Sequence, residues 1–135
     1  MSPKKMAESW VKLWSQADSA AFAALFDEAI DYTDNAFDIR KHGRADIEEH
    51  HRIWLGAAPD FSIELEQLHE LGNTVVVQGL GRGTFNGNDL ANGALKATGK
   101  PFQGRLAAVI ICGENGIVKC TEYYDRVQMP GVPAA

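Results

Sequence analysis

The side chains best suited to chemistry in this chain are a carboxylate and a phenol close to its end. Glu122 and Tyr124 are two positions apart in a strand-like segment, so both lie on one face of the strand. A carboxyl group enclosed by aromatic side chains has its pKa raised by desolvation, toward values useful for proton transfer near neutral pH. Glu122 is therefore a candidate general base or acid, and Tyr124 a candidate wall of its pocket. The alternative is that Glu122 pairs with a cation or faces solvent.

A second phenol and carboxylate, Tyr32 and Asp34, project from one side of an earlier strand-like segment. A phenol can hold a carbonyl oxygen while a nearby carboxylate moves a proton. This pattern makes Tyr32 a candidate donor to a substrate oxygen and Asp34 a candidate base. A structural role is the alternative, because Asp34 and Asn35 form an ordinary turn signal and tyrosine is common in strands.

Two adjacent histidines lie in a helix-like segment. His50 and His51 are separated by about 100° around a helix, so only one of them faces inward, and the sequence leaves open which. Either could act as a general base or donate a hydrogen bond to a substrate oxygen. The pair lacks the spacing of a helical zinc site and no third ligand is evident, so no metal is expected.

Three further residues are candidate contacts for a substrate. Trp14 and Trp54 stand in helix-like segments and would form walls of a pocket, together with the phenol near the chain end. Trp10 and Trp14 are one helical turn apart, which is also the spacing of ordinary core residues. Gln78 would supply one hydrogen bond.

Arg105 is the last candidate, because it interrupts an otherwise apolar strand-like segment. A buried arginine needs a partner, and Glu122 or Asp125 on the following strand is within reach. An ion pair with Glu122 would lower the pKa of that carboxyl group and weaken it as a base.

The elements that must position these residues begin with helices. Apolar residues at helical spacing predict a helix over 4–16, a second that begins at Asp18 or Ser19, and a third that opens at Gly43. A short strand over 29–34 separates the second helix from the third.

From residue 61 onward the hydrophobic pattern has the two-residue period of strands. Four strands linked by hairpins are predicted, over 61–68, 74–85, 102–112 and 117–127. Glycine at every second position of 79–83 favours bulges or sharp bending. The Gly-rich segment 86–100 is predicted to be a loop, and it would suit a lid over a pocket.

This order of elements predicts an α+β fold, in which a curved, mixed and mostly antiparallel sheet packs on three helices from the N-terminal half. One domain is expected over residues 4–128. Residues 129–135, which contain two prolines and a glycine, are expected to form a loose tail.

The composition excludes several classes of protein. Apolar residues make up 45% and charged residues 23% of the 135 residues, as in ordinary globular domains. The net charge is −5 and no basic block is present, so nucleic acid is not an expected partner. No stretch approaches the ~20 apolar residues that span a bilayer, and the basic start is not followed by the apolar run of a signal peptide. No membrane association is expected.

The two cysteines are too few for a disulfide framework and lack histidine partners at zinc spacing. Cys112 and Cys120 both lie in apolar strand-like runs, so buried free thiols are expected. A reducing, cytoplasmic location fits this expectation.

The order and spacing of several segments resemble the SnoaL-like branch of the nuclear transport factor 2-like superfamily. The segments that carry the resemblance are 26–32, 43–47, 54–61, 116–118 and 122–125, and the resemblance as a whole covers about residues 4–128. The resemblance implies a strongly bent, cone-shaped sheet closed on one side by helices, with ligands entering at the open end. It also implies a homodimer formed through the outer face of the sheet.

Members of that superfamily include ketosteroid isomerase, limonene epoxide hydrolase, scytalone dehydratase and polyketide cyclases, which use acid–base chemistry on small, mostly apolar molecules without metal or organic cofactor. Other members are adaptors without activity. The resemblance implies that Glu122 stands where limonene epoxide hydrolase and the cyclases keep an acidic residue. It places Tyr32 at the carbonyl-polarising tyrosine of scytalone dehydratase, and Thr33 or Asp34 at the base of ketosteroid isomerase.

One departure from a relative narrows the chemistry. Limonene epoxide hydrolase needs an arginine and an aspartate on the middle strand, and the comparable stretch here, residues 78–81, carries neither. Epoxide hydrolysis of that kind is therefore not expected.

The expected function is a cofactor-free isomerase, cyclase or dehydratase that acts on a small carbonyl compound of polyketide or terpenoid type. The alternatives are a binding module with the same pocket but no turnover, and an adaptor that uses the outer face of the sheet. The number of titratable groups that converge inside the pocket discriminates between them.

Overall fold

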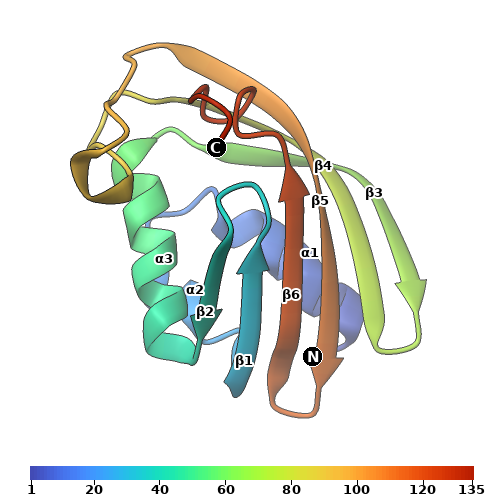
Figure 1. Cartoon of the computed structure of the whole chain (residues 1–135). Helices are drawn as coiled ribbons and strands as arrows, with labels where there is room; N and C mark the ends of the chain where they lie inside the picture. Colours follow the sequence, from blue (N-terminus) through green and yellow to red (C-terminus); the bar gives the residue numbers. More distant parts are fainter.

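The helices of the computed structural model, which describes all 135 residues, all precede residue 58 and lie on the concave side of one sheet (Figure 1). The elements are α1 (Pro3–Leu13), α2 (Ser19–Ala23), β1 (Phe26–Asp34), β2 (Ile39–His42), α3 (Arg44–Ala57), β3 (Ser62–Leu71), β4 (Thr74–Thr84), the short turn η1 (Ala91–Gly93), β5 (Pro101–Gly113) and β6 (Gly116–Tyr124). The three predicted helices and the strands that follow them are thereby confirmed.

The helices begin where the capping signals predict. Asp18 accepts a hydrogen bond from the Ala21 amide at 3.0 Å, so Asp18 rather than Ser19 caps α2. Gly43 precedes α3 with φ of 84°, a left-handed conformation that favours glycine. The short helix α2 and the start of α3 are thus fixed by single residues.

The sheet has six strands in the order β2-β1-β6-β5-β4-β3. Every neighbouring pair is antiparallel except β1 and β6, which run parallel. The predicted mixed, mostly antiparallel sheet is confirmed. It curves around the helices without closing, and β2 and β3 form its edges (Figure 1). The parallel pair brings the first and last long strands of the chain side by side.

The strand β2 was not predicted from the sequence. It is four residues long, it carries three polar side chains, and its residues alternate between half-buried and exposed. Its pairing with β1, from Asp31–His42 to Asp34–Ile39, depends on the turn after Asp34, in which Asp38 has φ of 53°. The Asp-Asn turn signal marks this turn, but a short polar edge strand has no hydrophobic pattern to reveal it.

His51 is a structural residue that ties the helices together. Its Nε2 lies 2.8 Å from the Leu13 carbonyl oxygen and its Nδ1 lies 2.7 Å from the Ser19 hydroxyl. A carbonyl oxygen only accepts, so Nε2 carries the proton and Nδ1 accepts from Ser19. The ring stacks on Phe22 at 4.4 Å, and burial lowers the pKa of His51, which favours this neutral form.

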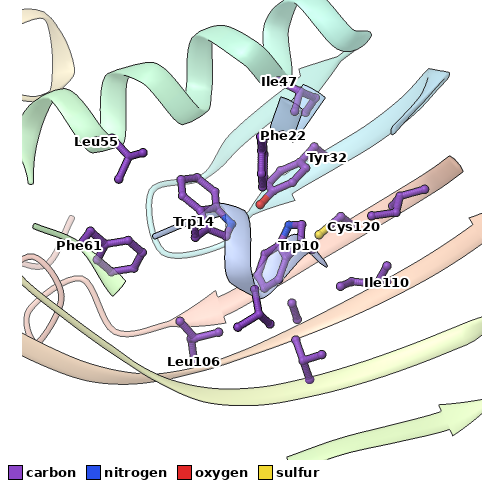
Figure 2. Close-up of a cluster of buried hydrophobic side chains, with 14 of the residues drawn as sticks. Trp10, Trp14, Phe22, Tyr32, Ile47, Leu55, Phe61, Leu106, Ile110 and Cys120 are labelled. Carbon is purple, nitrogen blue, oxygen red and sulfur yellow. The ribbon is translucent and has the colours of Figure 1, made fainter. Parts of the chain in front are cut away.

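The hydrophobic core lies between the helices and the concave face of the sheet (Figure 2). Its largest fully buried side chains are aromatic, namely Trp10, Tyr32, Phe22, Phe26 and Phe85. Cys112 and Cys120 are buried and free, as the sequence predicts. None of the helices is long and apolar enough to span a membrane.

The C-terminal segment differs from the loose tail expected for residues 129–135. Met129 and Val132 are buried and belong to the core. The side chain of Met129 lies over Gly81 of β4 and Gly104 of β5, which face each other across the two strands. A Cβ atom on Gly81 would lie 2.5 Å from the Met129 sulfur, so these glycines form the notch that holds the methionine. The proline and glycine content suggests a mobile tail, but the burial of Met129 and Val132 holds the segment against the core.

This notch can be tested by a double-mutant cycle. Gly81→Ala inserts a methyl group against the Met129 sulfur and should lower the free energy of unfolding by about 1–3 kcal/mol. Met129→Ala leaves a cavity and should cost about 2–5 kcal/mol. In the Met129→Ala background the cost of Gly81→Ala should shrink, because its main clash is gone. Urea unfolding measures the free energy of unfolding of the native chain, of the two single variants and of the double variant. Leu71→Ala, at a residue that is 71% exposed, is the control and should have little effect. Additive costs would contradict this packing.

Candidate functional site

A small cavity that opens to solvent, with about 30 Å³ of free space, lies between α1, α3 and the concave face of the sheet. Most of its lining is apolar or aromatic, with a few titratable groups, which is the usual make-up of a small-molecule site. The lining residues are Trp10, Trp14, Asp34, His50, Trp54, Phe61, Ile63, Leu106, Glu122, Tyr124 and Met129.

Glu122 faces this cavity from β6 and is only 7% exposed. The Tyr32 hydroxyl donates a hydrogen bond to its Oε1 atom. Burial raises the pKa of Glu122 to about 8, because no cation near the carboxyl group compensates for the loss of water. At neutral pH Glu122 therefore carries a proton, and no hydrogen bond within the chain uses its Oε2 atom.

Asp34 lies beside Glu122, because the parallel register of β1 and β6 pairs the two residues directly. Asp34 is 3% exposed, and its Oδ2 accepts from the Tyr124 hydroxyl at 2.6 Å. Its Oδ1 accepts from the backbone amides of Ala36 at 2.9 Å and Phe37 at 3.1 Å. Burial raises the pKa of Asp34, but these hydrogen bonds oppose the shift. Of the two carboxyl groups, Asp34 is the one with several hydrogen bonds that favour its ionised form, and with the charge of Arg126 they offset part of the rise in its pKa.

His50 is the histidine that faces the cavity. Its ring, Asp34 and Glu122 have nitrogen and oxygen atoms within 4.8 Å of one another. Burial, helped by the nearby charges of Lys41 and His51, lowers the pKa of His50 to about 4, so the ring is neutral at physiological pH. The hydrogen bonds of this region engage His51 and the tyrosines and leave the His50 nitrogens without a protein partner.

Asp34, His50 and Glu122 also have the donor atoms and spacing of a metal site. One tyrosine hydroxyl donates to each carboxyl group, from Tyr124 and Tyr32 respectively. These hydrogen bonds engage one oxygen atom of each carboxyl group and do not involve His50.

The aromatic walls of the cavity stand nearly perpendicular to one another. The planes of Trp14 and Phe61 meet at 89°, those of Trp54 and Phe61 at 87°, and the ring centroids are 6.2 and 5.4 Å apart. Tyr124 adds a wall 6.4 Å from Trp54. Trp14, Trp54 and Tyr124 thus lie where the sequence predicts walls.

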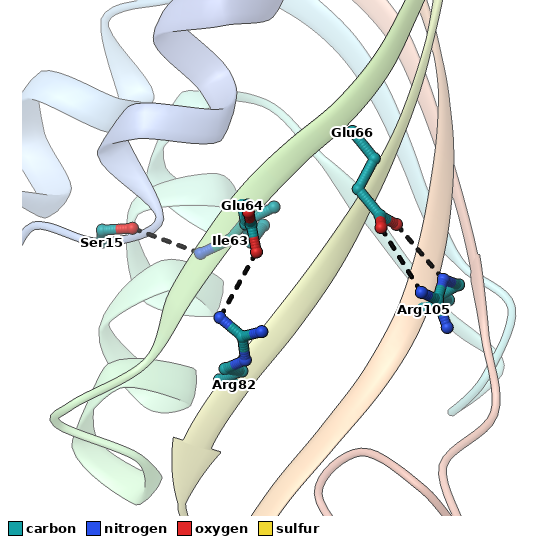
Figure 3. Close-up of polar contacts among 6 residues, drawn as sticks. All are labelled: Ser15, Ile63, Glu64, Glu66, Arg82 and Arg105. Atoms are coloured by element: carbon teal, nitrogen blue, oxygen red, sulfur yellow. Dashed lines mark hydrogen bonds and ion pairs between the residues drawn. The ribbon is translucent and has the colours of Figure 1, made fainter.

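Arg105 and Gln78 do not reach the cavity, which corrects the sequence prediction. Arg105 lies on the outer face of β5 with a side chain 74% exposed, and it pairs with Glu66 (Figure 3). Leu106 is buried, and alternation along the strand turns Arg105 outward. Gln78 is also exposed and contacts His69. Glu122 therefore has no arginine partner that would lower its pKa.

His51 is the other predicted site residue that the structure removes from the cavity, because both of its nitrogens are used between the helices. The loop 86–100 does not act as a lid over this opening either. Its residues Gly87 and Asn88 donate to the backbone oxygens of Ala57 and Gly56 at the end of α3, and none of the loop lines the cavity. The loop is anchored by these bonds.

Five lining residues were not proposed as site residues from the sequence: Trp10, Phe61, Ile63, Leu106 and Met129. Alternation in the strand around Leu106 indicates an inward side chain, but it cannot separate a pocket wall from the core. For Met129 no sequence signal was available, because its position depends on the glycine notch.

The comparisons with known proteins agree with this architecture. The family model of the SnoaL-like domain matches residues 7–121. No curated protein matches the sequence at a significant level.

Solved structures with the same fold have low sequence identity to the chain. A ketosteroid isomerase-like protein from Catenulispora acidiphila, solved in complex with trimethylamine, has a TM-score of 0.82 and 18% identity, over 99% of this chain and 97% of that one. IdmH from Streptomyces antibioticus, named as a candidate polyketide cyclase, has a TM-score of 0.79 and 15% identity, over 96% of both chains.

A nuclear transport factor 2-like protein from Burkholderia thailandensis has a TM-score of 0.75 and 24% identity, over 96% of this chain and 95% of that one. These likenesses show the fold. The family match over most of the chain goes further, and the protein therefore belongs to the SnoaL-like domain family.

Proposed function

We propose that this protein is a cofactor-free enzyme that moves a proton on a small, mostly apolar carbonyl compound, as an isomerase, cyclase or dehydratase. The observation that carries the proposal is that two buried carboxyl groups, each with its own tyrosine, face one aromatic cavity. Environments that push two carboxyl pKa values apart allow one group to act as acid and the other as base.

Asp34 and Glu122 divide these roles in the proposal. The Asp34 carboxylate removes a proton from the carbon next to the substrate carbonyl, and the electron pair of that C–H bond moves toward the carbonyl oxygen. Protonated Glu122 donates a hydrogen bond from Oε2 to that oxygen and stabilises the negative charge. The proton on Asp34 then returns to another carbon, or the enolate carbon attacks a second carbonyl group and the proton passes from Asp34 to the alkoxide oxygen that this attack forms.

Tyr32 and His50 support the protonated Glu122. The Tyr32 hydroxyl donates to Oε1, which orients the carboxyl group and leaves Oε2 for the substrate. Neutral His50 has both a donor and an acceptor nitrogen next to the carboxyl groups, so it can hold a substrate oxygen or relay a proton. His51 has no part in this scheme.

A binding module without turnover is the second candidate function. It is favoured by the structure from Catenulispora acidiphila, whose bound trimethylamine is a small molecule with no carbonyl group. In this second candidate function, the cavity lined by Asp34 and Glu122 would hold a ligand without turnover, and both carboxyl groups would serve only to recognise that ligand.

The raised pKa of Glu122 predicts how stability depends on pH. The folded pKa is about 8 and the unfolded value is about 4.5, so the stabilisation is fully present below pH 4.5 and is lost as pH rises to 8. Between pH 6.5 and 8, above the titration of unfolded histidines, the free energy of unfolding should fall by up to about 1.4 kcal/mol per pH unit. Glu122→Gln should remove this slope in urea unfolding, whereas Glu114→Gln, in an exposed turn, should keep it. A slope retained in Glu122→Gln would show that another group titrates.

Proton removal can be measured without the natural substrate. Exchange of the α-protons of β-tetralone in D₂O, followed by NMR, reports the proposed step directly. Asp34→Asn should slow exchange by about 10²–10⁴-fold, because the base is lost. Glu122→Gln keeps a hydrogen-bond donor, so it should slow exchange less and abolish the loss of rate above pH 8. Exchange that is unchanged in Asp34→Asn and Tyr32→Phe would rule out this division of roles, with Glu114→Gln as the control.

We also propose that two copies pair through the outer face of the sheet. Val76 and Val109 are half-buried neighbours on this face, and Tyr123, which pairs with Ala107 two positions before Val109, is 51% exposed. Light scattering after gel filtration should give the mass of a dimer, and Val109→Lys should give a monomer, because it puts an unpaired charge into the contact. Leu71→Lys, at the end of the β3–β4 hairpin, should leave the dimer intact. A monomeric native chain would exclude this interface.

A further inference from the structure

The cavity that holds Asp34 and Glu122 combines aromatic walls with acidic groups, and no lysine or arginine lines it. We propose that this cavity binds a small alkylammonium cation, with the aromatic rings around its alkyl groups and the two carboxyl groups as its counter-charge. The inference rests on the proposed function in that it uses the same cavity, and it adds the charge of the ligand.

The arrangement of the rings supports a cation. Ring faces carry negative partial charge, and cages of several rings recognise methylated ammonium groups. Trp14 and Trp54 each pack edge-to-face against Phe61, with ring centroids 6.2 and 5.4 Å apart, and all three rings line the cavity. Tyr124 closes a further side, at 6.4 Å from Trp54. A flat aromatic ligand would favour parallel walls, whereas crossed walls suit a compact, rounded group.

The charges around the cavity support the same conclusion. Glu122 is nine-tenths buried, and its one hydrogen-bond partner is the neutral Tyr32. His50 is neutral, so it supplies no positive charge. Arg126 lies over the Phe37 ring at 4.7 Å and its charge opposes the rise in the pKa of Asp34, but it does not line the cavity. A buried carboxyl group without a counter-charge is costly to ionise, and a cationic ligand would provide that counter-charge.

Other ligand charges fit the cavity less well. An anion such as a phosphate or a carboxylate would meet two carboxyl groups and no cation. A small metal ion would use the oxygen atoms but leave the aromatic walls without a role, because hard cations take oxygen ligands. An alkylammonium ion uses both features, since its methyl groups are apolar and its charge is spread over them.

Binding of such a cation should be linked to the proton on Glu122. The groups that face this carboxyl are Tyr32 and Asp34 from β1, Tyr124 from β6 and His50 from α3, while β5 presents the apolar Ala108. A cation stabilises the ionised form, so binding releases a proton below pH 8 and becomes tighter as the pH rises.

The test compares choline with its uncharged carbon isostere, the alcohol in which a quaternary carbon replaces the nitrogen. Calorimetry on the full chain should show choline binding at least about 10-fold more tightly at pH 8, because only the cation gains from the rings and the carboxylate. The affinity for choline should rise at least about 5-fold from pH 6 to pH 8, and that of the isostere should not change. Equal binding of the two compounds, or no binding of choline at millimolar concentration, would overturn the inference.

Variants test the two parts of the site separately. Trp54→Leu removes one wall and should weaken choline about 5- to 30-fold, while Leu71→Ala at the exposed end of β3 should have no effect. Glu122→Gln should weaken choline and remove its pH dependence, while Glu114→Gln should not. Circular dichroism and thermal unfolding verify that each variant is folded. Should Trp54→Leu fail to fold, Tyr124→Phe and Asp34→Asn replace it, and unchanged choline affinity in both would refute the site.

The inference and the proposed function can fail independently. Proton exchange on β-tetralone without selective choline binding would leave the enzyme and remove the cation site. Selective choline binding without exchange would support the cation site in a binding module. Choline should also inhibit the exchange when both are present, and exchange that is unaffected by saturating choline would contradict a shared cavity.

Discussion

The burial of two adjacent carboxyl groups at the seam between β1 and β6 is the constraint on which the site depends. The parallel register puts Asp34 beside Glu122 and Tyr32 beside Cys120, so both acids and one phenol face the same interior. Carboxyl groups so close together and so poor in water cannot both ionise freely. The chain responds with unequal surroundings: three hydrogen bonds hold Asp34, whereas one tyrosine holds Glu122. Because of this difference, Asp34 is suited to act as the base and Glu122 as the hydrogen-bond donor in the proposed reaction.

The rest of the fold serves to keep this seam dry and accessible from one side. The helices cover the concave face, His51 joins them through Leu13 and Ser19, and His50 on the next position is left free to reach the carboxyl groups. The outer face carries the paired charges of Glu66 with Arg105 and Glu64 with Arg82, so charge is sorted across the sheet (Figure 3). The two faces of one sheet therefore present different chemistry, as alternation along each strand requires.

Sequence reasoning predicted most of the fold because local signals agreed with it. Helical spacing, the Asp18 cap, the hairpin turns and the two-residue period all pointed to the observed elements. It predicted Glu122, Tyr32, Asp34 and one histidine as site candidates, since these break apolar patterns. It could not decide between His50 and His51, because helix rotation depends on tertiary packing. It was wrong about Arg105 and Gln78, because both lie on the outer face of the sheet and a strand's residue pattern near a polar side chain does not show which face turns inward. It missed β2 and the buried Met129, because neither has a local pattern.

The position of Met129 has a consequence for synthesis of the protein. Met129 lines the cavity and fills the notch between two central strands. Trp10 and Trp14 line the same cavity, and they precede Met129 by more than 100 residues in the sequence. The residues between these tryptophans and Met129 must therefore be synthesised before the cavity can be completed. Until then, the rest of the fold does not cover the tryptophans. Contacts of such long sequence separation form late, and they expose apolar surface to chaperones in the meantime.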